Sequence, residues 1–221
     1  MTTSGTFDFN LSVSEIIEEA YENIGLEART GYDLHTAQRS LNLLLLEWGN
    51  RGLHLWTTET LNLPMVPGQG SYPLPATTVD VLEAVMRRDG VDLPMARISR
   101  ADHTFLPDKN TPGRPHQFMT LRLREPVLKV WPVPDRDSDV MVINLMRQLE
   151  DVGRASNTVD IVKRYLPALI AGLAFKLSIK KQPEMAMALR EHYEDVLSRA
   201  MDEDVERVSF RAVPGGRYLR V

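Results

Sequence analysis

The chain has 221 residues, of which 43% are hydrophobic and 25% are charged, so it can bury an ordinary core in one domain or two small ones. Its formal net charge of -4 argues against a broad basic face for binding nucleic acid, since that binding depends on many lysines and arginines. The absence of cysteine excludes disulfides, thiol catalysis and cysteine metal sites. Residues 1–11 lack the basic start and apolar run of a secretory signal, so we expect synthesis in the cytoplasm.

Two amphipathic helices are predicted near the start of the chain. Ser12 and Glu15 form a capping-box pattern, and apolar residues then recur at helical spacing until Gly25 provides a stop. A second helical pattern begins near Asp33 and ends before Gly52. Leu43 and Leu46 widen the apolar arc of this second helix, and an arc of that width predicts neighbours on two sides.

The period changes after Gly52, where prolines, glycines and β-branched residues divide the chain into short runs. Asp89 and Gly90 form a hairpin signal between two of these runs. Residues 99–105 have the length of one helical turn, and residues 107–115 are expected to form an open loop. Asp135, Asp137 and Asp139 imitate the start of a calcium loop, but the later loop positions do not fit, which favours a solvated turn. The expected strands are residues 55–63, 71–74, 81–88, 91–98, 118–124, 127–131 and 140–147.

The helical period returns near Val159 and runs to Leu177, with Pro167 expected in the first turn or at a kink. This region contains the most apolar window of the chain, which is too short to span a membrane. Pro183 opens a last helix that extends to about Asp204.

These elements predict an α+β fold. Short helices must gain stability by packing, so the helices from the two ends of the chain are expected to form one antiparallel bundle. An antiparallel β-rich domain is inserted between the two halves of the bundle. The expected domains are residues 1–54 and 151–204 for the bundle, residues 55–150 for the β-rich insertion and residues 205–221 for an extended C-terminal tail.

The C-terminal tail carries four arginines and alternates like a strand, but it has too little apolar surface to fold alone. One interpretation is a solvated chain end. The other is a segment that docks on a partner, which the aromatic residues among the arginines favour. The candidate docking residues are Arg207, Val208, Phe210, Arg211, Arg217, Tyr218, Leu219 and Arg220.

Small residues line one side of the helix that follows Val159, and these include Ala171, Gly172 and Ala174. They allow close approach either by another helix of the same chain or by the next subunit of an assembly. Trp56 and Trp131 in the β-rich region are further candidates for a subunit interface, although the default for both is a place in the local core.

No catalytic, cofactor-binding or metal-binding residue is predicted. The five histidines show no spacing that presents two ring nitrogens on one helix face, and no serine stands in a nucleophile-elbow pattern. A pair of carboxylates placed by the fold is sufficient for a glycosidase, so the sequence alone leaves that chemistry open.

Several local strings, in this order, resemble the head-to-tail adaptor or connector proteins of tailed bacteriophages, particularly the tail tubular type. The resemblance covers nearly the whole chain and depends on order and spacing rather than on any single string. The strings are residues 14–24, 41–48, 67–75, 98–102, 113–115, 130–135 and 165–169.

The resemblance implies a virion structural protein that is not an enzyme and needs no cofactor. It implies a homo-oligomer, a ring of twelve copies beneath the portal protein, which extends the DNA channel and receives the tail nozzle or tail tube. Double-stranded DNA would pass through the lumen, and the protein would lie at the head–tail interface. Two alternatives stay open: a DNA-handling ring protein such as a small packaging subunit, and a tail-associated wall hydrolase.

Overall fold

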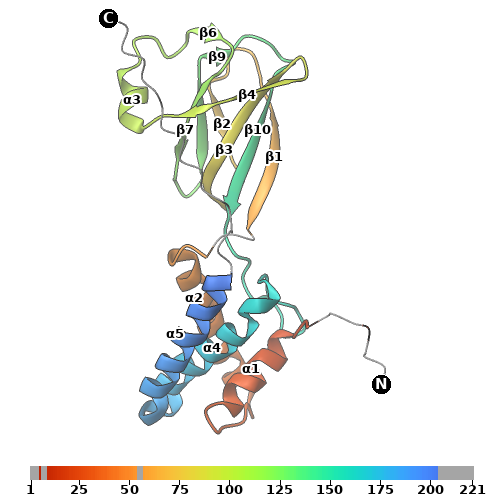
Figure 1. Cartoon of the computed structure of the whole chain (residues 1–221), viewed down its shortest axis with the longest axis vertical. Helices are drawn as coiled ribbons and strands as arrows, with labels where there is room; N and C mark the ends of the chain where they lie inside the picture. The colour runs from red at the N-terminus through yellow and green to blue at the C-terminus, as the bar shows by residue number, and fades with distance from the viewer. Residues whose placement is uncertain (1–4, 6–8, 54–56, 204–221) are drawn as a thin grey trace, which may run out of the picture.

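The computed structural model describes residue 5, residues 9–53 and residues 57–203, and it has helices at one end and strands at the other (Figure 1). This arrangement confirms the α+β class. The helices at the first end are α1 (Val13–Glu22), α2 (Gly31–Asn50), α4 (Leu166–Lys181) and α5 (Ala186–Glu203), and the short α3 (Arg100–Phe105) belongs to the strand end. Single 3-10 turns, Lys163–Tyr165 and Pro183–Met185, precede α4 and α5.

Local capping sets the starts of the first two helices. The Ser12 hydroxyl accepts a hydrogen bond from the Glu15 backbone N–H while the Glu15 carboxylate accepts one from the Ser12 N–H, as the capping-box pattern predicts. Thr30 and Asp33 form the same reciprocal pair, so α2 starts before Asp33 rather than at it. Thr30 lies outside the apolar repeat, which is why the repeat alone places the start late.

Helix α4 begins at Leu166, so the expectation of helix from Val159 is wrong. Pro167 lies in the first turn, as predicted, where its missing N–H costs nothing. Asp160 is instead held outside the helix by a salt bridge to Arg147 at 2.6 Å and by the backbone N–H of Glu150 at 3.2 Å. These contacts keep the preceding segment irregular despite its apolar spacing.

The four long helices share one hydrophobic core, with α4 packed against α1, α2 and α5. The largest buried side chains of this shared core include Trp48, Tyr21, Tyr165 and Tyr193. Trp48 of α2 donates its Nε1–H to the Tyr193 hydroxyl of α5 at 2.8 Å. At the rim of this contact, Arg51 reaches Glu194 with both terminal nitrogens, at 2.8 and 2.9 Å.

In the described part of the chain, ten strands form two four-stranded sheets and one short pair. The first sheet has the order β1 (Thr58–Pro64), β10 (Val140–Arg147), β3 (Thr78–Arg88) and β4 (Val91–Pro94), and all its pairs are antiparallel. The second has the order β2 (Ser71–Pro73), β8 (Val127–Trp131), β7 (Gln117–Leu121) and β5 (Ala96–Arg97). The pair is β6 (Pro112–Gly113) with β9 (Val133–Pro134).

The expectation of one strand over residues 91–98 is wrong, because the chain changes sheets at Met95. The Met95 side chain is buried between β4 and β5, and its backbone N–H donates to the Ala84 carbonyl at 2.9 Å. After this crossing β5 runs parallel to β7, and β6 runs parallel to β9. The β-rich region is therefore mostly but not wholly antiparallel, and the expected loop of residues 107–115 contains β6.

The Asp89–Gly90 hairpin is confirmed: both residues have positive φ, 53° and 77°, and join β3 to β4. Alternate residues of the two sheets enclose a second hydrophobic core, which includes Met65 and Met86. Asp80 of β3 fastens one sheet to the other, since its carboxylate pairs with Arg97 at 2.8 Å and with Arg122 beyond β7.

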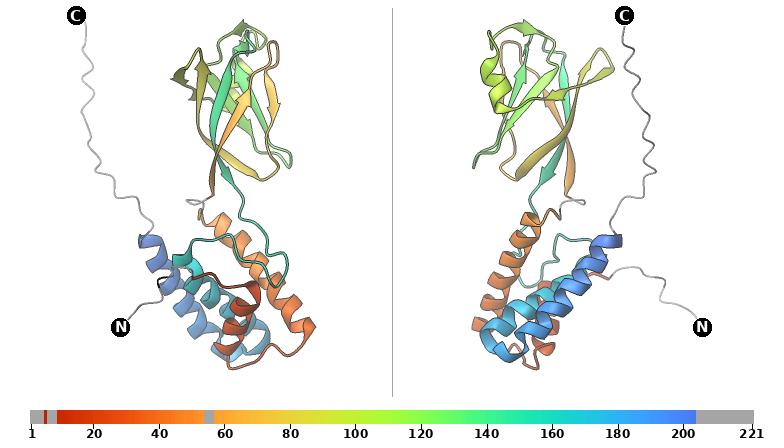
Figure 2. Two further views of the ribbon diagram at one scale, coloured as in Figure 1. Left: turned by 90° about the vertical axis from the view of Figure 1, so that its right-hand side faces the viewer. Right: turned by 60° about the vertical axis from the view of Figure 1, so that its left-hand side comes forward.

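Two chain segments join the helical end to the strand end (Figure 2). Near the start of β1, the Thr57 carbonyl accepts from the Arg147 N–H at the end of β10, at 2.9 Å. The segment after β10 then lies along the helices, where the Val152 N–H donates to the Asn42 side chain at 2.7 Å. Further on, Thr158 forms an antiparallel bridge with Ser12.

Candidate functional site

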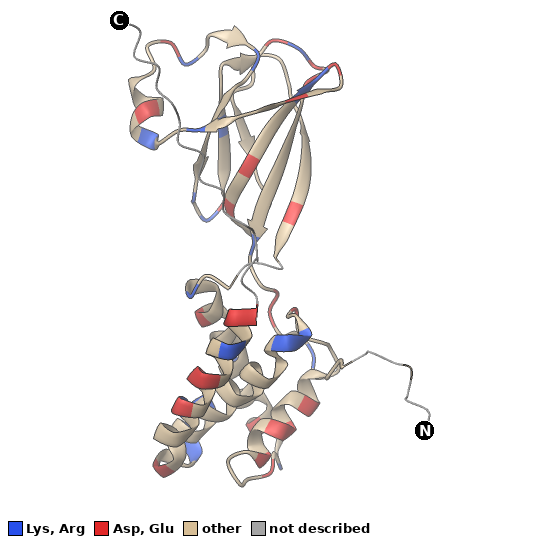
Figure 3. Ribbon diagram, viewed as in Figure 1, with Lys and Arg blue, Asp and Glu red and all other residues tan. Residues whose placement is uncertain are grey.

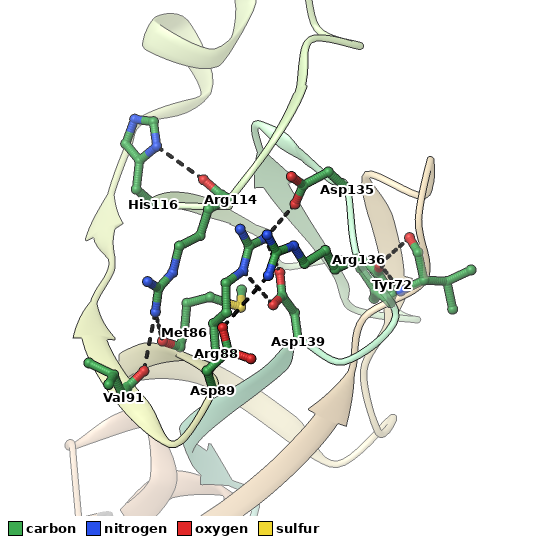
Figure 4. Close-up of polar contacts among 11 residues, drawn as sticks. Tyr72, Met86, Arg88, Asp89, Val91, Arg114, His116, Asp135, Arg136 and Asp139 are labelled. Atoms are coloured by element: carbon green, nitrogen blue, oxygen red, sulfur yellow. Dashed lines mark hydrogen bonds and ion pairs between the residues drawn. The ribbon is translucent and has the colours of Figure 1, made fainter.

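The far end of the β-rich region is held together by a charged network around Arg88, the residue that ends β3 (Figure 4). Arg88 binds Asp139 through two hydrogen bonds, Nε to Oδ1 at 2.7 Å and Nη2 to Oδ2 at 2.5 Å, and it also contacts Asp135. The Asp139 side chain is 0% exposed and that of Arg88 12%. The Asp139 hydrogen bond raises the pKa of the Arg88 guanidinium, and Arg88 in turn lowers the pKa of Asp135.

A solvated turn does lie here, since residues 135–138 are exposed between β9 and β10, but Asp139 is buried, so the expectation is wrong for Asp139 alone. Asp139 is a buried partner of Arg88, and Asp135 is its half-exposed second partner. Sequence reasoning missed Arg88 because its place beside these carboxylates depends on pairing of β3 with β10. The available signal was an arginine directly before a hairpin turn.

A second arginine holds the β3–β4 hairpin against the rest of this far end of the β-rich region (Figure 4). Arg114 donates through Nη2 to the Met86 carbonyl at 3.1 Å and to the Val91 carbonyl at 3.2 Å. The next contacts involve His116, whose ring meets the Trp131 ring edge-on at 5.3 Å between centroids. Trp131 is half-buried and donates its Nε1–H to the Asp108 carbonyl at 3.0 Å.

The far end of the β-rich region, which we call the tip, offers a rigid surface with exposed apolar side chains. Its loops are tied by arginine contacts, and the described residues contain no group of three or more histidine, aspartate or glutamate side chains placed for a metal ion. Apolar side chains are exposed beside the network, including Val91 and Leu93 on the edge strand β4 and Phe105 of α3, which is 81% exposed. Rigid loops with exposed apolar groups suit a protein contact.

A cleft of about 790 Å³ lies where the helices meet the strands. Asn42 and Leu46 line it from α2, Glu59 from β1 and Arg147 from the end of β10. Burial acts to raise the pKa of Asp160 beside it, but hydrogen bonds from Arg147 and from the Glu150 backbone outweigh burial and lower it. The Arg147–Asp160 pair therefore fixes the turn of the chain from β10 towards the helices.

The chain was compared with models of known protein families, and the SU10 adaptor protein model matches residues 12–216. The chain belongs to the SU10 adaptor protein family. The resemblance to phage head-to-tail adaptors is thereby confirmed, and the membership indicates a structural protein of a bacteriophage virion that contacts portal and tail components. Comparison with curated proteins gives no match.

The predicted docking residues of this SU10 adaptor lie outside the described residues. The family match nevertheless extends over the first part of the C-terminal tail, so it includes Arg207, Val208, Phe210 and Arg211 and ends before Arg217. Trp56 also lies outside the described residues. In the part of the chain that the structure describes, no helix is long and apolar enough to cross a membrane.

The small residues of α4 lie inside the helical core of the adaptor. Ala171 and Ala174 are buried, and a Cβ added to Gly172 would lie 2.8 Å from both Leu44 Cδ2 and Tyr193 Cε2. Packing within the chain therefore accounts for these residues, and little of their surface is left for a second copy.

Proposed function

We propose that this protein is the structural head-to-tail adaptor of a tailed phage, and that twelve copies form a ring under the portal. The ring extends the DNA channel and attaches the tail nozzle or tail tube. The observation that carries this proposal is the family match over residues 12–216, which spans the helices, the strands and the start of the C-terminal tail.

The two ends of the molecule suit two roles in such a ring. In this proposal the antiparallel bundle of N- and C-terminal helices forms the ring wall, and the β-rich insertion contacts adjacent subunits and the distal tail. Two separate hydrophobic cores support this division, because each end can keep its shape while the other is bound. The tip around Arg88, which salt bridges and hydrogen bonds hold together, supplies the rigid surface that the distal contact requires.

The acidic balance of the chain suits a channel wall. Carboxylates are prominent on the helical end (Figure 3), and the net charge is -4. Phosphates that meet carboxylates are repelled rather than held, so DNA can slide past without sticking.

The C-terminal tail is the proposed portal anchor. Residues 205–221, if extended at about 3.3 Å per residue, reach roughly 50 Å, far enough to enter a crevice on a neighbouring protein. There the tail adds a strand to a sheet edge or places its arginines against portal carboxylates. Repetition around the ring makes many weak contacts act as one strong attachment.

Deletion of residues 205–221 tests the anchor. The truncated chain should keep the circular dichroism spectrum of the full chain but no longer co-sediment with purified portal rings. A matched variant keeps the length and replaces Arg207, Arg211, Arg217 and Arg220 by glutamine, and it separates the contribution of charge from that of strand pairing. Unchanged co-sedimentation of the truncated chain refutes the docking role.

A further inference from the structure

Helix α2 has a second face that the described chain leaves uncovered. The residues of this face, which we call the α2 stripe, recur at spacings of three or four along the helix: Tyr32, His35, Arg39, Leu43, Leu46 and Asn50. Leu43 and Leu46 are 56% and 57% exposed, although α2 already buries Leu41, Leu44 and Trp48 in the helical core. The stripe contains no carboxylate, and its one full charge is the cation of Arg39.

A second cation lies beside the α2 stripe. The Lys180 ammonium, from the end of α4, donates to the Ser40 hydroxyl of α2 at 2.7 Å. Arg39 and Lys180 thus make one half of the stripe basic, while Leu43 and Leu46 make the other half apolar.

Helix α5 carries the opposite surface. Six exposed residues, which we call the α5 stripe, run along its outer side from the turn before it: Glu184, Ala188, Glu191, Asp195, Ser198 and Asp202. Met187 lies next to them and is 67% exposed. Arg199 flanks the stripe and pairs with Asp195 on the same helix, which leaves an excess of carboxylates.

The two stripes are matched in length and lie on opposite sides of the helical end. Each covers a similar number of residues, and at about 1.5 Å per residue each is about 27 Å long. Figure 2 shows α2 and α5 at opposite edges with α4 between them, and each stripe lies on the side of its helix away from the shared core. Surfaces of this kind pair head to tail, and repeated head-to-tail contacts close into a ring.

We propose that the α2 stripe of one copy packs against the α5 stripe of the next copy. Arg39 and Lys180 face the carboxylates of the neighbour, and Leu43 and Leu46 cover Met187 and Ala188. This inference rests on the proposed ring and names the surface through which it forms. One pair of helices buries less than the roughly 800 Å² per partner of a standard interface, so each contact is weak and concentration-dependent.

Cysteine cross-linking of the full chain tests the contact, because the natural sequence has no cysteine to interfere. The double variant Leu43→Cys/Ala188→Cys, concentrated and mildly oxidised, should give a ladder of dimers, trimers and longer species. The matched control is Leu43→Cys/Glu18→Cys, which moves the second cysteine to the outer face of α1. Cross-linking of the first pair should be at least about tenfold faster, since contact raises the effective concentration of the two thiols.

Charge reversal provides the second readout. Arg39→Glu should slow the ladder of the Leu43→Cys/Ala188→Cys chain, and addition of Glu191→Arg should restore it. Equal rates for the two cysteine pairs would overturn the proposal, and so would dimers without longer species. Cross-links from Leu43→Cys to a cysteine within residues 205–221 of the same chain would assign the stripe to the chain's own tail instead. Co-sedimentation with portal rings is measured separately. If it persists while the cysteine pairs cross-link at equal rates, this interface is wrong but the adaptor function stands.

Discussion

Trp48 and Tyr193 are 145 positions apart in the sequence, yet the indole N–H of the first donates to the hydroxyl of the second at 2.8 Å inside the helical core. Both side chains are almost completely buried. The bond joins the N-terminal helices to the last helix, so the helical end closes only after the whole β-rich region has been made.

Replacement of Tyr193 by phenylalanine should destabilise the helical end. The buried indole N–H of Trp48 then lacks an acceptor, and an unsatisfied buried donor lowers the free energy of unfolding by about 1–3 kcal/mol. Urea unfolding followed by tryptophan fluorescence measures the free energy of unfolding. Tyr32→Phe is the control, because Tyr32 is exposed and its change should lie within about 0.5 kcal/mol of zero.

Gly172→Ala should also lower stability. The new methyl group would meet Leu44 and Tyr193 at 2.8 Å, closer than atoms in a packed core allow, and overpacking costs about 1–3 kcal/mol. Thermal unfolding should show a lower midpoint than that of the parent chain. Gly31→Ala is the matched control, since nothing lies within 4 Å of an added Cβ there. Equal midpoints for the two variants would contradict the close packing of α4 against α2 and α5.

Arg88→Met should unfold the β-rich tip. It leaves the Asp139 carboxylate buried without its bidentate partner, and loss of one member of a buried pair costs about 3–5 kcal/mol. Hydrogen exchange should become faster in the hairpin at Asp89 and in the start of β10. Arg136→Met is the control: its salt bridge to Asp89, at 3.6 Å, is exposed and should contribute less than about 1 kcal/mol. Similar exchange in both variants would contradict a structural role for Arg88.

Asp80 should make the stability of the β-rich region depend on pH. Burial acts to raise its pKa, but hydrogen bonds from Arg97 and Arg122 outweigh burial and hold the folded pKa below the ordinary value. A depressed folded pKa means that the stabilisation is complete above the unfolded pKa, about 3.9, and is lost as the pH falls through the folded pKa.

Asp80→Asn tests this dependence through urea midpoints measured from neutral pH down to about pH 3. The variant should be less stable than the parent chain at neutral pH, and the difference should shrink below about pH 4, where Asp80 of the unfolded parent chain begins to take up a proton. A difference that stays constant with pH would show that the ion pairs between the two sheets do not contribute.

Local signals predicted most of the secondary structure. The capping box at Ser12, the positive-φ turn at Asp89 and Gly90, and the first-turn proline at Pro167 each depend on neighbouring residues alone. The errors fall where distant contacts decide the backbone. Residues 159–162 have helical spacing but are irregular, and residues 91–98 alternate like one strand but divide between two sheets at Met95.

The candidate site was less predictable, because strand pairing decides which charged side chains lie next to each other. The spacing of Asp135, Asp137 and Asp139 indicated a polar turn, but nothing local distinguishes the buried Asp139 from its exposed neighbours. Only the register of β10 against β3 brings Asp139 under Arg88. Likewise, the small residues of α4 predict that another segment packs closely against this helix, and the tertiary structure shows that Leu44 and Tyr193 make this contact.

The sequence by itself determined the α+β class, the order of helices and strands, the absence of cysteine chemistry and the adaptor resemblance, because each depends on composition, periodicity or local strings. Only the tertiary structure decided that the wide apolar arc of α2 has one buried and one exposed side, and that Arg88 neutralises a buried carboxylate. An apolar repeat indicates only that a side chain is favourably packed against some neighbour. Whether that neighbour lies in the same chain depends on the tertiary contacts, which decide which side chains are buried.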